Sequence, residues 1–410
     1  MKFFPVRIAA YPVRTQFFLA YGLIGCLLPY LAIYLNRDIG LRESTIGWLM
    51  SLSSLAVVLS PVVLTAVADT RVSGRVLLGW LFLGCSGCML ALAWLGTPWA
   101  AFVFFGIHVF LFVSVLPLQD GLNFSIQRKR EREGLPTTPY HQIRVWGTVG
   151  FIVPSLILPL LFSLGVGLTA MLYLAAVYGV IGYLNTRRLP LVAPGRKGAA
   201  KNAAKPRLPT AEAAQVLLRP RIFAFCAALF IANMASAAYF GFYPLYLTRV
   251  IGLSDSAAGL VFNIGVVLEI ACILAYGKAV DRFGLRGVMI AATAAMTARM
   301  LLLAAFPVAG VAVASQALHG FVVIALQIGP ITYLNSLAGD RFRNSMQGLY
   351  MMLIAGASRV IGNIWAGQLA GIDLLLVYFV AGLFCVLATV LLAVSFRPDV
   401  AAGSPSSPNA

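Results

Sequence analysis

The sequence has few charged residues for its length. Of its 410 residues only 10% are Asp, Glu, Lys or Arg, and just thirteen are acidic. A soluble domain carries about 25% charged residues, because its surface must face water. The shortage of charge therefore excludes a water-soluble globular fold for this chain.

Residues that bind metals or activate nucleophiles are also scarce. The chain has three His and six Cys, and every Cys lies inside an apolar segment. Cys85 and Cys88 form a C-x-x-C, but no second pair and no nearby His completes a zinc site. The sequence also lacks an H-E-x-x-H motif. It thus predicts neither an enzyme nor a metal or cofactor site, and the cysteines are interpreted as packing residues.

Long apolar stretches, in contrast, recur from end to end. The chain is 60% hydrophobic, with a mean hydropathy of +0.91, and a membrane-spanning helix needs about 20 mostly apolar residues. Charged residues, Pro and Gly interrupt the stretches. The pattern predicts an all-α membrane protein with twelve transmembrane helices, near residues 14–35, 44–67, 75–95, 99–126, 141–164, 167–186, 221–248, 256–277, 286–306, 308–335, 344–370 and 374–396.

An internal repeat divides these helices into two sets of six. Residues 39–47 read IGLRESTIG, and residues 251–259 read IGLSDSAAG, 212 positions later. Asp69 and Asp281 are also 212 positions apart. Many transporters consist of such repeats, so we expect two pseudo-symmetric six-helix bundles. They comprise residues 1–186 and 221–396, with a basic cytoplasmic linker at 187–220 and a disordered tail at 397–410.

The basic residues indicate how the chain crosses the membrane. Lys and Arg accumulate in cytoplasmic loops, and most of the thirty here fall on one side of the predicted helices. Both termini are therefore predicted to lie in the cytoplasm, with the helices in the inner membrane. The net charge of +17 follows from this topology, so no nucleic-acid binding is expected. The basic linker is either solvated or in contact with anionic lipid headgroups.

The loop after the eighth predicted helix carries a motif. Its G-x-x-x-D-R-x-G-x-R pattern at 277–286 resembles the loop motif of the major facilitator superfamily, and the loop after the second helix holds a looser copy. The resemblance implies that a carboxylate accepts from a helix N-terminus while a basic residue latches the two bundles. A plain basic loop is the alternative. The motif residues are Asp69, Arg75, Gly277, Asp281, Arg282, Gly284 and Arg286.

Ionisable side chains inside the predicted helices indicate a functional site, because such groups are costly in a bilayer. In the second half, Glu269, Arg299, His319 and Arg359 all lie about 16–21 Å from a helix end, near the midplane of a ~30 Å core. This shared depth predicts a polar cavity. The role of Arg359, functional or structural, stays open.

The first half contributes Asp120 and Arg144, which lie on neighbouring predicted helices toward their cytoplasmic ends. They form either a functional Asp–Arg pair or a static strut. Arg144 belongs to the segment QIRVWGTVGF at 142–151. This segment resembles the fifth-helix signature of bacterial nucleoside:proton symporters and of phenylpropionate permeases. The segment around His319 is similar to the phenylpropionate branch and, more distantly, to lactose permease.

The resemblance implies that Arg144 and Glu269 contact the substrate, and that Glu269, Arg299 and His319 carry the proton. No acidic residue follows His319 on its helix, although nucleoside and lactose symporters have one there. We therefore expect Glu269, alone or with His319 or Asp120, to carry the proton. The alternative is that the protein is a uniporter.

Three substrate classes fit the sequence. Three intramembrane arginines against two carboxylates suit an anion such as an aromatic carboxylate, whereas the fifth helix most resembles nucleoside carriers. The aromatic side chains that are candidates to stack on a base or a phenyl ring, or else to pack or anchor at the interface, are Tyr21, Trp146, Tyr239, Tyr243 and Trp365. We favour proton-coupled uptake of a nucleoside-like solute by a monomer, with an aromatic acid, a sugar or a transport-inactive sensor as alternatives. The candidate substrate-binding residues are Arg144, Asp120, Glu269, Asn233, Gln316 and Trp146.

Overall fold

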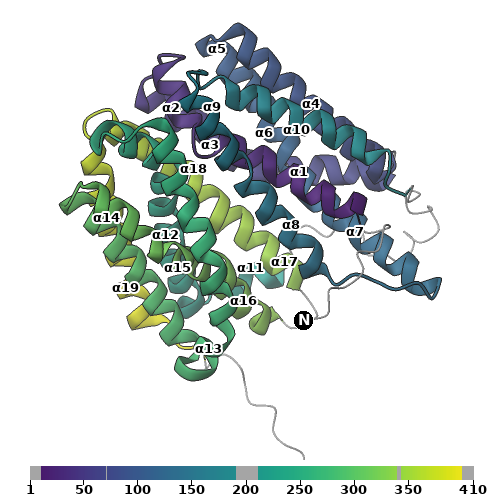
Figure 1. Ribbon diagram of the computed structural model, residues 1–410. Coiled ribbons are helices and arrows are strands. Elements are labelled where there is room, and N and C mark those ends of the chain that lie inside the picture. Colours follow the sequence, from purple (N-terminus) through teal and green to yellow (C-terminus); the bar gives the residue numbers. More distant parts are fainter. Residues whose placement is uncertain (1–10, 71, 191–210, 339–342, 399–410) are drawn as a thin grey trace, which may run out of the picture. The chain divides into compact units, whose positions relative to one another are not determined.

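A computed structural model describes residues 11–70, 72–190, 211–338 and 343–398 of the chain (Figure 1). These residues form helices joined by short turns, and no strand occurs among them. Most of the predicted linker, at 191–210, and most of the predicted tail, at 399–410, lie outside the described residues. The described helices cluster into two compact units.

The first unit contains the helices up to residue 186, together with residues 253–260. Residues 253–260 are held there in part by Asp255, whose Oδ2 lies 2.7 Å from Nη2 of Arg37. The predicted first helix is interrupted at Pro29, because proline has no N–H to donate. The helices are α1 (Tyr11–Leu27), α2 (Leu31–Arg37), α3 (Glu43–Thr70), α4 (Gly74–Leu95), α5 (Pro98–Ala100), η2 (Ala101–Phe105), α6 (Gly106–Val113), α7 (Val115–Arg132), α8 (Tyr140–Ile152), α9 (Pro154–Ser163) and α10 (Ala170–Thr186).

The second unit contains the remaining described helices, except that the start of α13, up to Leu260, belongs to the first unit. Several of its long segments alternate α-helix with short π-helical or 3₁₀ turns, which are frequent at functional sites. In order, they are α11 (Ala211–Leu217), α12 (Pro220–Leu245), η3 (Tyr246–Val250), α13 (Asp255–Ala305), α14 (Ala309–Ala314), η4 (Ser315–Leu318), α15 (His319–Val323), η5 (Ile324–Ile328), α16 (Gly329–Ala338), α17 (Arg343–Leu349), η6 (Tyr350–Gly356), α18 (Ala357–Ala370) and α19 (Leu374–Ser395).

The membrane spans among the described residues agree with the predicted twelve. Ten segments are long and apolar enough to cross a bilayer, and the shorter apolar helix α10 adds another. Helix α13 has 51 residues, interrupted by Gly284 at φ 70°. A straight helix of that length would measure about 77 Å, far beyond a ~30 Å hydrocarbon core. Residues on the two sides of Gly284 therefore form two spans, and the predicted all-α fold of twelve helices is confirmed.

Glycines allow α1 and α8 to pack closely in the first unit. A Cβ atom at Gly150 would collide with the backbone oxygen of Phe18, and one at Gly25 would collide with that of Phe151. Each glycine thus faces the backbone of the other helix, where no side chain can yield. The contact holds α8, which carries Arg144, against α1.

Replacing Gly150 with Ala is expected to destabilise the protein, because the added methyl group forces α1 and α8 apart. Overpacking of this kind costs about 1–3 kcal/mol, which thermal unfolding in detergent measures as a lower midpoint. Gly87→Ala is the matched control, since a Cβ at Gly87 meets no atom within 4 Å. Equal midpoints for the two variants would contradict the close packing.

Candidate functional site

A buried hydrogen-bond network in the second unit has Arg299 at its centre. Arg299 lies in the second half of α13 and is 0% exposed. Its Nη2 donates to the hydroxyl of Tyr239 on α12 and to Oε1 of Gln316 on η4, the latter over 2.8 Å. The guanidinium also lies 4.0 Å from the centre of the Tyr239 ring. Three elements of the unit are therefore joined through one cation.

Gln316 extends this network to a second tyrosine. Its Nε2 donates to Tyr243 over 2.6 Å and to Tyr239 over 3.2 Å. Tyr243 in turn donates to the backbone oxygen of Ala312 over 3.0 Å. Both amide atoms of Gln316 are thus occupied, and the side chain is 0% exposed. In this conformation Gln316 positions Arg299 and has no free atom to offer a solute.

His319 connects Arg299 to Glu269. Its Nδ1 lies 3.0 Å from Nη1 of Arg299, and its Nε2 lies 3.6 Å from Oε2 of Glu269. A guanidinium can only donate hydrogen bonds, so Nδ1 must accept and the ring proton must sit on Nε2. This geometry requires a neutral imidazole whose N–H points toward the carboxylate of Glu269.

These three side chains differ in how deeply they are buried. The His319 side chain is 3% exposed, whereas that of Glu269 is 25% exposed. Gly265, one turn before Glu269 on α13, makes room for the network, because a Cβ there would collide with Oε1 of Gln316. The row Arg299–His319–Glu269 therefore leads from a fully buried cation to a partly exposed carboxylate.

The first unit holds a second polar group of side chains, on α1, α7 and α8. Oδ1 of Asp120 accepts a hydrogen bond of 2.9 Å from the hydroxyl of Tyr140. The guanidinium of Arg144 lies 4.0 Å from the centre of the Tyr21 ring. Gly147 leaves space for this stacking, since a Cβ there would approach Tyr21 to 2.6 Å and Nη1 of Arg144 to 2.9 Å.

The anticipated Asp120–Arg144 ion pair is not formed among the described residues, although the two side chains belong to the same group. Tyr140 occupies the carboxylate and Tyr21 covers a face of the guanidinium instead. Tyr140 and Arg144 lie one turn apart on α8 and contact different partners. Within the described part of the chain, the N–H donors of the Arg144 guanidinium therefore have no protein acceptor.

The other predicted site residues lie apart from these two groups. Asn233 is 0% exposed, and its Nδ2 donates to the backbone oxygen of Leu229 in its own helix. Trp146 is 40% exposed on α8. Arg359 lies half-buried on α18, and no hydrogen bond or ion pair joins it to another described residue.

The loop-motif arginines bind carbonyl oxygens within their own units. Nη1 of Arg75 donates to Leu189, just after α10, over 2.7 Å. Nη2 of Arg286 donates to Ala393, in the last turn of α19, over 2.6 Å. Arg286 thus caps the end of α19, where carbonyls lack partners, whereas Arg75 binds the chain just beyond α10. The latch between bundles stays a prediction.

The structure describes some of the remaining motif residues more fully than others. Asp69 lies at the end of α3, in a stretch whose side chains are outside the described part. Gly284 supplies the left-handed backbone that separates the two spans of α13. The other three, Gly277, Asp281 and Arg282, are exposed.

Tyr140, Tyr239 and Tyr243 are the site residues whose roles the sequence analysis missed. Tyr239 and Tyr243 were candidates for ring stacking on a substrate, yet their hydroxyls bind the Arg299–Gln316 pair. Their spacing of four residues places both on one helical face. That spacing, facing an intramembrane arginine, is the signal that indicates a shared hydrogen-bonding role.

Comparisons with known proteins agree with this architecture. The model of the MFS_1 like family matches residues 12–381. The chain is 26% identical over 392 residues to the probable 3-phenylpropionic acid transporter of Escherichia coli K12, covering 94% of this chain and 95% of the relative. It is 25% identical over 371 residues to the nucleoside permease NupG of the same organism, covering 86% and 85%. The crystal structure of NupG superposes with a TM-score of 0.83 at 21% identity, covering 95% of this chain and 100% of that one.

Proposed function

We propose that this chain, which belongs to the MFS_1 like family and is therefore a multi-pass membrane transporter, moves a small polar solute together with a proton. The observation that carries the proposal is the row Arg299–His319–Glu269, which ends in a partly exposed carboxylate. Ionisable side chains are costly inside a membrane and proton relays are one of the uses for which they are kept, which supports coupled protonation. Alternating access, in which the two bundles expose the site in turn, is the mechanism we assign to it.

Within the row, Glu269 is the group we assign to the proton. A second proton on His319 would have to sit on Nδ1, where Nη1 of Arg299 already donates over 3.0 Å. Protonating His319 therefore breaks the buried network, whereas protonating Glu269 only neutralises a carboxylate at its edge. In this proposal the solute binds together with the proton, and the neutralised site is then able to reorient.

The substrate we favour is a nucleoside-like solute. The polar group of the first unit offers one carboxylate, one guanidinium and several aromatic rings, which suits ribose hydroxyls and a base. The nucleoside permease among the relatives supports the same choice. The expected setting is the inner membrane, with both termini in the cytoplasm and the transporter monomeric, as the distribution of Lys and Arg and the family resemblance suggest.

An aromatic carboxylate is the second candidate, and a specific observation favours it. Neither Arg144 nor Arg359 has a carboxylate partner within 4 Å in the described structure, so the intramembrane cations have capacity for an anion. The 3-phenylpropionic acid transporter among the relatives points the same way. A thermal-shift screen of the purified protein decides between them, because a ligand that binds only the folded state raises its melting temperature. A shift with phenylpropionate and none with nucleosides would overturn the nucleoside assignment.

Variants of Arg144 give a second test that distinguishes a nucleoside from an aromatic carboxylate as the substrate. For a neutral nucleoside, Arg144→Lys and Arg144→Gln should weaken binding similarly, by roughly tenfold to a hundredfold, since both lose the planar fork of donors. For a carboxylate, Arg144→Lys should retain clearly more affinity than Arg144→Gln, because the charge survives. Titrating each variant with both ligand types by thermal shift measures the difference. Unchanged affinity in both variants would remove Arg144 from the binding site.

A further inference from the structure

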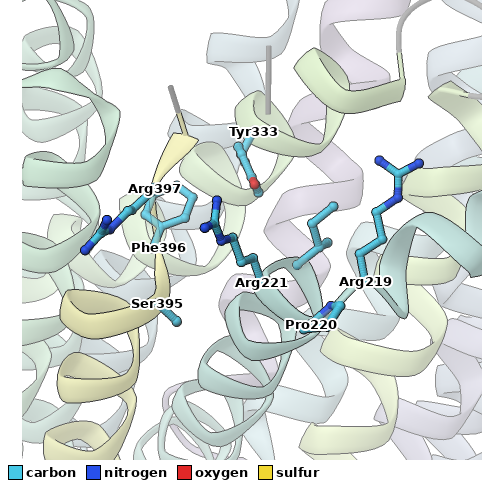
Figure 2. Close-up of a pocket in the computed structure, with 8 residues that line it drawn as sticks. Arg219, Pro220, Arg221, Tyr333, Ser395, Phe396 and Arg397 are labelled. Carbon is cyan, nitrogen blue, oxygen red and sulfur yellow. The ribbon is translucent and has the colours of Figure 1, made fainter. Parts of the chain in front are cut away.

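A basic cavity opens at one end of the second unit, away from the network around Arg299 (Figure 2). Its volume is about 420 Å³. It lies between the first turn of α12 and the last turn of α19, which pack side by side. The lining includes the arginines Arg219, Arg221 and Arg397 and the apolar or aromatic side chains Ile222, Tyr333 and Phe396.

The arginines of this cavity lack counter-charges among the described residues. Figure 2 shows Arg221 between the other two arginines, near Phe396 and Tyr333. All three arginines are exposed, none has a hydrogen bond or ion pair to a described residue, and the lining contains no Asp or Glu. Arg219 and Arg221 flank the N-terminus of α12, where the helix dipole disfavours cations. Two exposed cations at a helix N-terminus, with Arg397 lining the same cavity, favour a bound anion there.

The depth of the cavity is that of the lipid headgroups. One membrane span begins at Pro220 and another ends at Ser395, both of which line the cavity. A third span includes the lining residue Tyr333. We take the ends of these apolar helices to mark where they leave the hydrocarbon core, which places the cavity at the level of phosphate groups.

The floor of the cavity is apolar and rigid. Phe225, Tyr333 and Phe396 form a mutual aromatic cluster, with ring centres 4.7–4.8 Å apart. Tyr333 is 4% exposed and Phe396 is 1% exposed. A free inorganic anion gains nothing from such a floor, whereas a phospholipid places its glycerol and first acyl carbons against it while its phosphate meets the arginines.

We propose that this cavity binds the phosphodiester headgroup of one anionic phospholipid, held by Arg219, Arg221 and Arg397 above the Tyr333–Phe396 floor. Basic pockets between membrane helices bind such headgroups in general. The site does not depend on which solute the protein transports. It would tie the ends of α12 and α19 together through a lipid.

The test is lipid binding to the purified full-length protein, measured by native mass spectrometry during titration with dioleoyl phosphatidylglycerol. The triple variant Arg219→Gln/Arg221→Gln/Arg397→Gln should lose the tightest binding event. Each arginine near a membrane phosphate contributes on the order of fivefold in affinity, so the triple variant should bind about a hundredfold more weakly. The single variant Arg397→Gln, located after the last helix, should show about a fivefold loss and guards against misfolding of the triple variant.

Matched controls show whether the loss of lipid binding comes from the cavity, from net charge or from a site for free anions. The variant Arg128→Gln/Lys129→Gln/Arg132→Gln removes the same charge from exposed positions at the end of α7 and should keep the tight event. Equal weakening by this control would reduce the effect to net charge and overturn the proposal. Phosphatidylcholine binding as tightly as phosphatidylglycerol would also overturn it. Displacement of the lipid by millimolar inorganic phosphate would show a free-anion site instead.

Discussion

Replacing Glu269 with Gln is expected to abolish uphill accumulation of the substrate while leaving exchange of labelled for unlabelled substrate intact. Gln has the shape of the protonated acid, so it preserves the contact with Nε2 of His319 but cannot release a proton. A gradient of one pH unit supports about tenfold accumulation per coupled proton. In proteoliposomes the wild type should approach that ratio, and Glu269→Gln should only equilibrate its substrate.

The matched control for this experiment is Asp373→Asn. Asp373 is an exposed carboxylate of the same unit, which caps α19 by accepting from the N–H of Leu375 over 2.9 Å. Its loss should leave the accumulation ratio unchanged. Uphill accumulation by Glu269→Gln would refute the assignment of the proton to Glu269. Loss of both accumulation and exchange in a folded protein would place Glu269 in substrate binding instead.

Replacing Arg299 with Met is expected to cause the largest loss of stability of any single change in the site. Met fills much of the space but leaves Nδ1 of His319 without a donor, while Tyr239 and Gln316 lose their charged donor and keep only hydrogen bonds within the Tyr239–Gln316–Tyr243 group. A buried group left unpaired costs about 1–3 kcal/mol, and a lost hydrogen bond to a charged group costs about 1.5–3 kcal/mol. Thermal unfolding in detergent should show a strongly lowered midpoint, and counterflow should be lost with it.

Two further variants separate the charge of Arg299 from its geometry. Arg299→Lys keeps the charge but offers a compact ammonium in place of a planar fork, so it should recover only part of the stability. Lys129→Met removes a cation from an exposed position on α7 and should leave the midpoint unchanged. An unchanged midpoint in Arg299→Met would show that the network does not hold α12, α13 and η4 together.

The fold was predictable because the sequence features that determine it are local. A spanning helix needs only a run of apolar residues of sufficient length, and the break at Gly284 matches the predicted boundary between the eighth and ninth helices. The break at Pro29 was not predicted, because the first helix was expected to be continuous over 14–35. The repeat spacing of 212 positions and the family resemblance then indicated two related halves. Helical rise placed Glu269, Arg299 and His319 at one depth, and the structure brings these three side chains into a row.

The partners of each polar side chain were not predictable in the same way. Depth along a helix follows from residue counting, but the direction of a side chain around the helix axis depends on how neighbouring helices pack. For this reason the structure replaces the expected Asp120–Arg144 pair with Asp120–Tyr140 and Arg144–Tyr21 contacts. The same reason makes Gln316 a support for Arg299 and not an open binding group.

The amino-acid order alone accounts for the membrane class, the twelve helices and the depth of the ionisable residues, because these depend on hydropathy and helical rise. Tertiary packing alone decides that Arg299 is enclosed by neutral partners, that His319 must be neutral beside it, and that Glu269 is only partly buried. It also gathers Arg219, Arg221 and Arg397, from the two ends of the second half of the chain, around one cavity. Contacts between residues far apart in sequence depend on helix packing, which no local pattern encodes.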